Sequence, residues 1–138
     1  MSNGSGFFAV SEDQLKRLLD GQLAHASFLQ PGGAEQPREN HDKAIACWYE
    51  LSQVLQAEAA CGAQQSDRIP TMVGYSSVSQ VQDTAAKLRV LAEAEVRKRC
   101  ESALMEASVD EVVAAVRGLT AFYERAATNK DAVLFRVA

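Results

Sequence analysis

The residues in this chain that could carry out acid–base, nucleophilic or metal chemistry are few and scattered. There are two histidines, His25 and His41, and three cysteines, Cys47, Cys61 and Cys100. A zinc site needs four such ligands, and neither an H-x-x-x-H nor an H-E-x-x-H pattern brings any of them together. His41 precedes Asp42 at an expected helix start, where adjacent side chains diverge. We therefore expect no metal site, and we expect Asp42 to serve the entry of that helix.

The sequence also lacks the local motifs of common enzyme classes. It contains no G-x-S-x-G elbow, no G-x-G-x-x-G turn and no phosphate-binding G-x-x-x-x-G-K loop. Two acids, Glu93 and Glu95, lie two positions apart, and residues at that spacing on a helix do not face one another. We expect no catalytic or cofactor-binding residue and a protein that is not an enzyme. A site assembled from residues without a local motif stays open as an alternative.

Cysteine usage and the first ten residues bear on location. Three cysteines without a close pair are typical of a reducing compartment, where they act as small apolar side chains. Residues 1–10 lack the basic start and long apolar run of a signal peptide. No stretch reaches the roughly 18–20 apolar residues of a membrane span. We expect a cytoplasmic protein that does not bind membranes.

Length, composition and charge indicate one acidic domain. The chain has 138 residues, of which 47% are hydrophobic and 23% charged, which is ordinary for a globular domain. We expect a single domain over residues 1–138, with residues 1–5 flexible. The net charge of −4 arises within residues 1–70. An acidic surface repels phosphate backbones, so nucleic-acid binding is not expected, and it favours association with basic protein surfaces.

Several helices follow from capping signals and apolar spacing. Ser11-x-x-Gln14 and Ser108-x-x-Glu111 have the form of capping boxes, and Ser77 caps a third helix. A long helix is expected from Asn40 or Asp42 to about residue 60, with Trp48 making its largest core contribution. The strongest apolar periodicity predicts a helix over residues 109–127. A polar break near residue 93 separates the helix that Ser77 starts from another over residues 96–105.

Short apolar runs predict strands at both ends of the chain. Residues 6–10 and 132–137 are strand candidates, and residues 71–75 form a weaker one. A lone strand leaves its backbone groups unpaired, so the two terminal strands are expected to pair, in antiparallel orientation. The expected fold class is α+β: mostly helical, with a small antiparallel sheet that pairs the N- and C-terminal strands and helices over one face.

Several segments, in order, resemble the YfbM-like family of small bacterial proteins of unknown function. The similarity covers residues 6–15, the Asp42-Lys43-Ala44 and Trp48-Tyr49-Glu50-Leu51 stretches, residues 75–81 and residues 119–134. This chain has Val78 where the family usually has proline, and its connection over residues 62–71 is shorter. Members of this family accompany polymorphic or type VI secreted toxins, and the resemblance therefore implies an immunity role.

The leading functional hypothesis is an immunity protein, or antitoxin, that neutralises a cognate bacterial toxin by stoichiometric occlusion. Acidic side chains in its first half can steer association with a basic active site. We expect no cofactor, and Tyr75 has two readings, a cap on the core or a surface anchor. The partner-binding residues expected from charge and loop position are Glu35, Glu39, Asp42, Asp67 and Tyr75.

Two alternatives stay open from the residues alone. One is an enzyme or small-ligand-binding protein with a site between helices and sheet, which a pocket holding His25 or His41 beside a carboxylate would favour. The other is a scaffold that oligomerises through the helix over residues 109–127.

Overall fold

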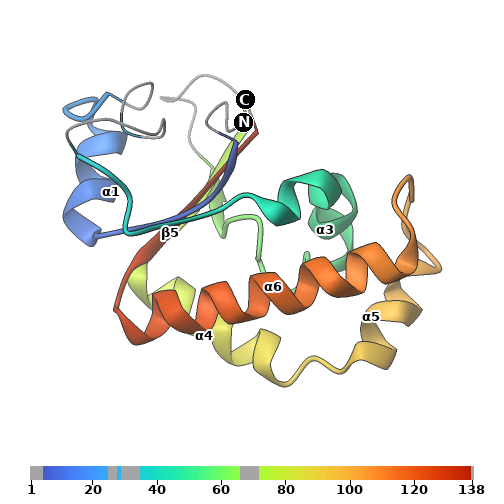
Figure 1. Ribbon diagram of the computed structural model, residues 1–138. Coiled ribbons are helices and arrows are strands. Elements are labelled where there is room, and N and C mark those ends of the chain that lie inside the picture. Colours follow the sequence, from blue (N-terminus) through green and yellow to red (C-terminus); the bar gives the residue numbers. More distant parts are fainter. Residues whose placement is uncertain (1–4, 25–27, 29–34, 66–71, 138) are drawn as a thin grey trace.

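The molecule is organised around one five-stranded antiparallel sheet. It was obtained as a computed structural model, which describes residues 5–24, 28, 35–65 and 72–137 (Figure 1). The strand order is β2-β1-β5-β4-β3, and every neighbouring pair is antiparallel. The strands are β1 (Gly6–Val10), β2 (Glu39–His41), β3 (Gln64–Gln65), β4 (Met72–Ser76) and β5 (Ala132–Val137).

The pairing predicted for the two ends of the sequence is confirmed. Strands β1 and β5 lie side by side in antiparallel register, with Phe8 opposite Leu134. Each also has a second neighbour, β2 beside β1 and β4 beside β5, so both are central strands. Every residue of β1 and the first five of β5 are buried. Continuous apolar runs are typical of strands covered on both faces.

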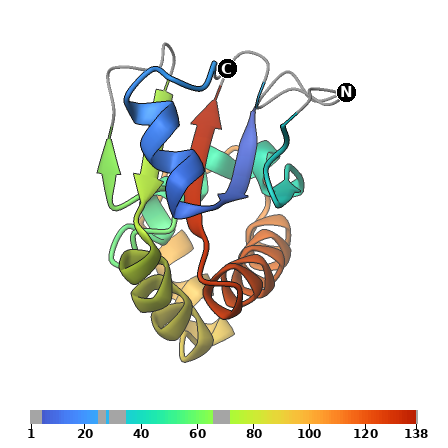
Figure 2. The ribbon, with the colours of Figure 1, turned by 90° about the vertical axis from the view of Figure 1, so that its left-hand side faces the viewer.

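Helices cover both faces of the sheet, whereas the sequence suggested only one. Helix α1 (Glu12–Leu19) lies on the face to which Phe8 and Val10 point, as Figure 2 shows. Side chains alternate along a strand, so Phe7 and Ala9 point to the opposite face. That face carries η1 (Lys43–Cys47), α3 (Trp48–Val54), α4 (Val78–Arg89), α5 (Glu93–Cys100) and α6 (Val109–Thr128).

Helix α6 is the main element against the larger core. Its Leu119, Phe122 and Tyr123 are fully buried. The Tyr123 hydroxyl donates a hydrogen bond of 2.6 Å to the Ala60 carbonyl, which ties the helix to the turn after α3. The predicted helix over residues 109–127 is therefore confirmed. Among the described helices, none has the length and apolar character needed to cross a bilayer.

The long helix expected over residues 42–60 is wrong in part. Strand β2 occupies Glu39–His41, a 3-10 helix follows, and α3 ends at Val54 before a run of turns. Three polar residues become a strand here because β1 supplies the pairing partner, which no local pattern reveals. Trp48 is only half-buried and packs edge-on against Tyr49.

The helix boundaries otherwise follow the capping residues. Ser11 and Ser77 begin α1 and α4 with full capping boxes, in which Gln14 and Gln80 return the hydrogen bond. Ser108 begins α6 and accepts from the Glu111 amide, but the Glu111 side chain does not bond back. The predicted second capping box is therefore half formed. Helix α5 begins at Glu93, three residues before the expected start.

Candidate functional site

A groove between η1 and α6 is the strongest candidate site in the described part of the chain. It has a volume of about 320 Å³ and is mainly apolar. Ligand sites are typically concave and apolar with a few polar groups, and this groove lies at the lower end of their size range. Helix α6 contributes residues at spacings of three and four, which share one helix face. The lining residues are His41, Lys43, Ala44, Ala46, Cys47, Glu111, Ala114, Ala115 and Gly118.

The two sides of the groove run in opposite chain directions. Just beyond the groove, Glu39 of β2 is ion-paired with Arg125 of α6. Further along, the imidazole of His41 lies against Gly118. The negative charge of Glu111 contributes to the raised pKa of the Cys47 thiol. The segment formed by β2 and η1 therefore runs antiparallel to α6, as Figure 1 also shows. The arrangement places Lys43 near the Gly118 end and Glu111 at the Cys47 end.

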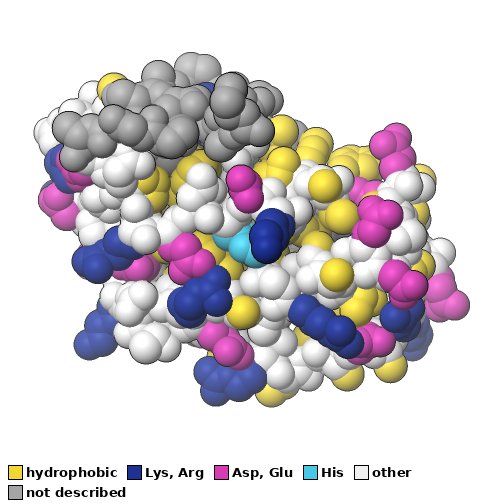
Figure 3. Space-filling view, in the orientation of Figure 1, with side chains coloured by type: hydrophobic (Ala, Val, Ile, Leu, Met, Phe, Trp, Pro, Cys, Tyr) yellow, Lys and Arg dark blue, Asp and Glu magenta, His cyan; other side chains and the backbone are white. Residues whose placement is uncertain are grey.

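His41 closes one end of the groove as a neutral, partly buried imidazole. Its ring stacks on Phe122 with centroids 5.5 Å apart and lies 6.4 Å from the ring of Phe7. The Nε2 atom is buried and has no hydrogen-bond partner among the described residues. Burial lowers the pKa of His41, because a charged ring would lose its hydration there. The histidine colour lies in the hollow near the centre of the face in Figure 3.

Two charged side chains of opposite sign lie at the rim. Lys43 and Glu111 are both exposed, and within the described residues neither forms a hydrogen bond or ion pair through its side chain. Glu39, by contrast, accepts hydrogen bonds of 3.0 and 2.5 Å from Arg125. That contact holds the pKa of Glu39 below its ordinary value. Within the groove lining, Lys43 and Glu111 are therefore the charged side chains still available to a ligand.

The chemistry that this groove supports is binding. The thiol of Cys47 lies in its wall, but burial and the nearby carboxylates of Glu50 and Glu111 raise its pKa, which disfavours the reactive thiolate. Among the described residues, no group of three or more potential ligands could hold a metal ion. The apolar floor suits an aliphatic body, and the rim suits charged ends.

Larger hollows elsewhere are less suited to a ligand. One of about 450 Å³ lies between α3 and α5. Its Arg99 is already used, since the guanidinium donates to Glu58 at 2.7 Å and to the Val54 carbonyl at 2.9 Å. Another of about 510 Å³ lies over the last turns of α6, where Arg125 is held by Glu39. Neither contains a histidine or an apolar floor of small residues.

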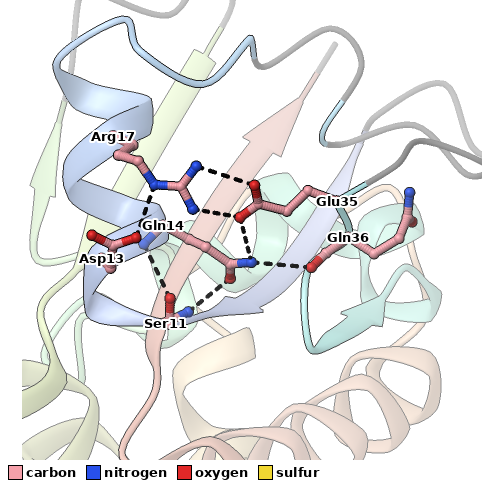
Figure 4. A network of polar contacts seen from close by, with 6 residues as sticks. All are labelled: Ser11, Asp13, Gln14, Arg17, Glu35 and Gln36. Carbon is pink, nitrogen blue, oxygen red and sulfur yellow. Dashed lines mark hydrogen bonds and ion pairs between the residues drawn. The ribbon is translucent and has the colours of Figure 1, made fainter.

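Of the predicted partner-binding residues, Glu35 is already engaged within the chain. It accepts from Arg17 at 2.5 Å and from the Gln14 side chain at 3.0 Å (Figure 4). Arg17 also donates to Asp13 at 2.8 Å, so one guanidinium serves two carboxylates. These hydrogen bonds hold the pKa of Glu35 below its ordinary value. Much of its negative charge is therefore neutralised before any partner arrives.

The remaining predicted residues do not form one patch. Asp42 is exposed next to the groove, and its side chain makes no capping bond to η1, contrary to the expected helix-entry role. Tyr75 lies on β4, packs with the α1-side core and donates to Gln64 at 3.2 Å. Glu39 and Asp42 thus flank the groove, whereas Glu35 and Tyr75 lie on the α1 side. Asp67 and His25 fall outside the described residues.

The groove itself was not predicted from sequence. Its floor is made of Ala114, Ala115 and Gly118, which were taken only as part of a core helix. Their spacing does carry a signal, because small residues three or four apart leave one face of a helix low. That signal gains meaning only when η1 is known to lie alongside.

Comparison with known proteins identifies the family but not a function. No match was found among curated proteins or among solved structures. One family model matches residues 1–136, which is nearly the whole chain. The chain therefore belongs to the family described as a domain of unknown function (DUF1877).

Proposed function

We propose that this protein is an immunity protein, which neutralises a cognate bacterial toxin by stoichiometric binding through the face that carries the η1–α6 groove. The class of partner comes from the YfbM-like resemblance, and the place comes from the groove. The toxin is expected to present a basic surface, because the whole chain carries a net charge of −4.

The observation that carries this proposal is the combination of groove and aromatic side chains on one face. Tyr49 is 46% exposed and follows Ala46 of the groove wall by three residues. Trp48, half-buried, packs against it with ring centroids 5.6 Å apart. Exposed aromatic residues beside a concave apolar surface with a charged rim are typical of binding hot spots. The exposed carboxylates of Asp42 and Glu111, neither of which forms an ion pair with another described residue, supply acidic charges at the rim.

Toxicity rescue tests the proposal directly. The toxin encoded beside this gene is expressed with and without the protein, and rescue should accompany a stable complex of the two. Ala114→Trp fills the groove, and Tyr49→Ala removes the exposed ring, so both should weaken rescue. Ala86→Trp is the matched control, because Ala86 is also exposed, on α4, and lies outside the groove. Full rescue by all three folded variants would move the partner surface elsewhere.

A second candidate function is binding of a small ligand in the same groove. It is favoured by the groove volume of about 320 Å³ and by the presence of His41 with charged Lys43 and Glu111. The groove lies between α6 and η1, with His41 at the end of β2, whereas the alternative hypothesis places its site between helices and sheet.

A thermal-shift screen against small metabolites separates the two functions. A ligand of the groove should raise the melting temperature of the wild type and of Ala86→Trp, but not that of Ala114→Trp. A screen with no such compound, alongside rescue from the toxin, would leave protein binding as the function.

A further inference from the structure

The charged groups at the groove have a fixed order along its length. Two contacts set the order, the ion pair of Glu39 with Arg125 and the close approach of His41 to Gly118. Cys47 and Glu111 also line the groove, and the charge of Glu111 acts on the Cys47 thiol. Lys43 follows His41 by two residues and lowers the basicity of its ring, so it lies near that end. Of the charged residues that line the groove, Lys43 therefore lies toward one end and Glu111 toward the other, and the exposed Asp42 beside Lys43 is outside the lining.

The separation of these ends follows from helix geometry. Glu111 and Gly118 are seven residues apart on α6, which corresponds to about 10.5 Å along the helix axis. Between them the floor consists of methyl and methylene groups, with Ala114 and Ala115 on α6 and Ala44 on η1. The groove is therefore mainly apolar between the two charged residues that line it.

Glu111 is available to a ligand because its side chain does not complete the capping box of α6. In α1 and α4, the residue three positions after the N-cap serine folds back and bonds to the N-cap amide. Glu111 occupies the same position in α6, but its carboxylate lines the groove instead. Because Ser108 still caps the helix through its hydroxyl, the helix start does not need the Glu111 side chain.

We propose that the groove is a binding site for an elongated zwitterion, a small molecule with an aliphatic body, an anionic group at the Lys43 end and a cationic group at the Glu111 end. The apolar body lies on the alanine floor, and each charged end pairs with an exposed side chain that has no partner among the described residues. His41, at the anionic end, supplies a neutral wall. The site deepens the second candidate function and rests on it, and it is independent of toxin neutralisation.

Binding of 8-aminooctanoate, octanoate and octylamine tests the polarity of the site. The first probe carries both charges, and the other two carry one each on a similar chain. Amide shifts of Ala115, Gly118 and His41 in nuclear magnetic resonance spectra give the dissociation constants. We expect saturable shifts at these residues, with 8-aminooctanoate binding most tightly. Tighter or equal binding of a singly charged probe would overturn the proposal.

Neutralising substitutions assign each end. Lys43→Met should weaken 8-aminooctanoate and octanoate about fivefold and leave octylamine unchanged, since an exposed ion pair contributes up to about that factor. Glu111→Gln should weaken 8-aminooctanoate and octylamine by a similar factor and leave octanoate unchanged. Lys87→Met and Asp83→Asn on α4 are matched controls, because both side chains are exposed and outside the groove. Equal losses in the controls, or loss of the same singly charged probe in both groove variants, would contradict the assigned polarity.

The same variants distinguish zwitterion specificity from ligand binding in the groove as such. A metabolite that binds wild type and loses binding in Ala114→Trp, but not in Lys43→Met or Glu111→Gln, would retain the ligand site and reject its zwitterion specificity. If the groove variants lose toxin rescue while none of the three probes binds wild type, the groove is a protein-docking surface and the zwitterion site is rejected.

Discussion

The imidazole of His41 lies against Gly118, so closely that a side chain at position 118 would be in tight contact with the ring. A Cβ atom built on Gly118 would lie 3.3 Å from His41 Cε1 and 3.6 Å from Nε2. Glycine inside a helix destabilises it by roughly 1 kcal/mol relative to alanine, so this position sacrifices helix stability. His41 and Gly118 both line the groove, so this pair is part of the contact between β2 and α6 at one of its ends.

Gly118→Ala should therefore have different effects in two backgrounds. In wild type we expect no gain in the free energy of unfolding, because the new methyl group pushes against the ring of His41. In His41→Ala the obstacle is gone, and the same change should stabilise the protein by about 1 kcal/mol. Urea unfolding of the four proteins measures the coupling. An identical effect in both backgrounds would show that the two residues do not interact.

The stability of the protein should fall in mild acid because of His41. Its pKa is lowered in the folded state, mainly by burial, and Arg125 and Lys43 also oppose its charge, while Glu39 and Asp42 favour it. Below the ordinary value of 6.5 the unfolded chain takes up a proton that the folded protein resists. The contribution of His41 is thus complete above that pH and is lost as the pH falls toward the folded pKa.

His41→Phe keeps an aromatic ring against Phe122 and removes the titration. Its free energy of unfolding should vary less between about pH 5 and pH 8 than that of wild type. The ion pair of Glu39 does not mask this effect, because a lowered carboxylate pKa acts below 4.5. A pH slope that survives unchanged in the variant would assign the acid sensitivity to another group.

Tyr123→Phe should destabilise the protein by about 1–2 kcal/mol, because it leaves the buried Ala60 carbonyl without its donor. Tyr75→Phe is the matched control. It removes a similar hydroxyl, but the bond to Gln64 is exposed, so we expect a change under about 0.5 kcal/mol. Thermal unfolding of both variants compares them. Equal losses would mean that the Ala60 carbonyl finds another donor.

Glu50 should be the most important single carboxylate for the loop before α6. It is only 4% exposed, and its Oε2 accepts from the amides of Glu106 at 3.0 Å and Ala107 at 2.7 Å. Glu50→Ala should cost about 2–3 kcal/mol, and Glu50→Gln less, because the amide oxygen can still accept both bonds. Backbone bonds hold the pKa of Glu50 low, so this contribution is lost as the pH falls below 4.5. Hydrogen exchange of the Glu106 and Ala107 amides, which should become faster when Glu50 no longer accepts from them, measures this loss.

Asp131→Asn should raise stability at neutral pH by about 1 kcal/mol. The Asp131 carboxylate is buried, and although Arg38 Nε lies 2.9 Å away, neither oxygen accepts a well-directed hydrogen bond from a described residue. Burial raises the pKa of Asp131, so its folded form loses stability as the pH rises above 3.8. The benefit of asparagine should therefore grow between acid and neutral pH. A benefit that is constant with pH would exclude charge burial as its cause.

Sequence patterns predicted the elements whose signals are local. The apolar runs predicted β1 and β5, the serine caps predicted the helix starts, and the apolar periodicity predicted α6. Each of these signals is contained within the segment that it predicts. Strand β2 was missed because Glu39, Asn40 and His41 are polar and become a strand only by pairing with β1. The same non-local contact carries His41 to α6, so the groove could not be predicted from either segment alone.

The predicted site residues show a similar division. Charge and loop position predict four acids as partner-binding residues, and two of the four, Glu35 and Glu39, are held by Arg17 and Arg125. Neither arginine is near its carboxylate in sequence, and Arg125 lies 86 residues away. Charge counts along a chain cannot show which charges the fold will pair.

The central position of β1 and β5 has a consequence for how the chain is made. When β1 leaves the ribosome, its principal partner has not been synthesised, and more than a hundred residues must follow first. Until then an apolar strand has one edge open and exposed to premature association. Closing so long a loop also makes the nucleus slow to form. The sheet therefore cannot fold until β5 has been synthesised. During synthesis, residues 6–10 should be the segment that depends most on protection by chaperones.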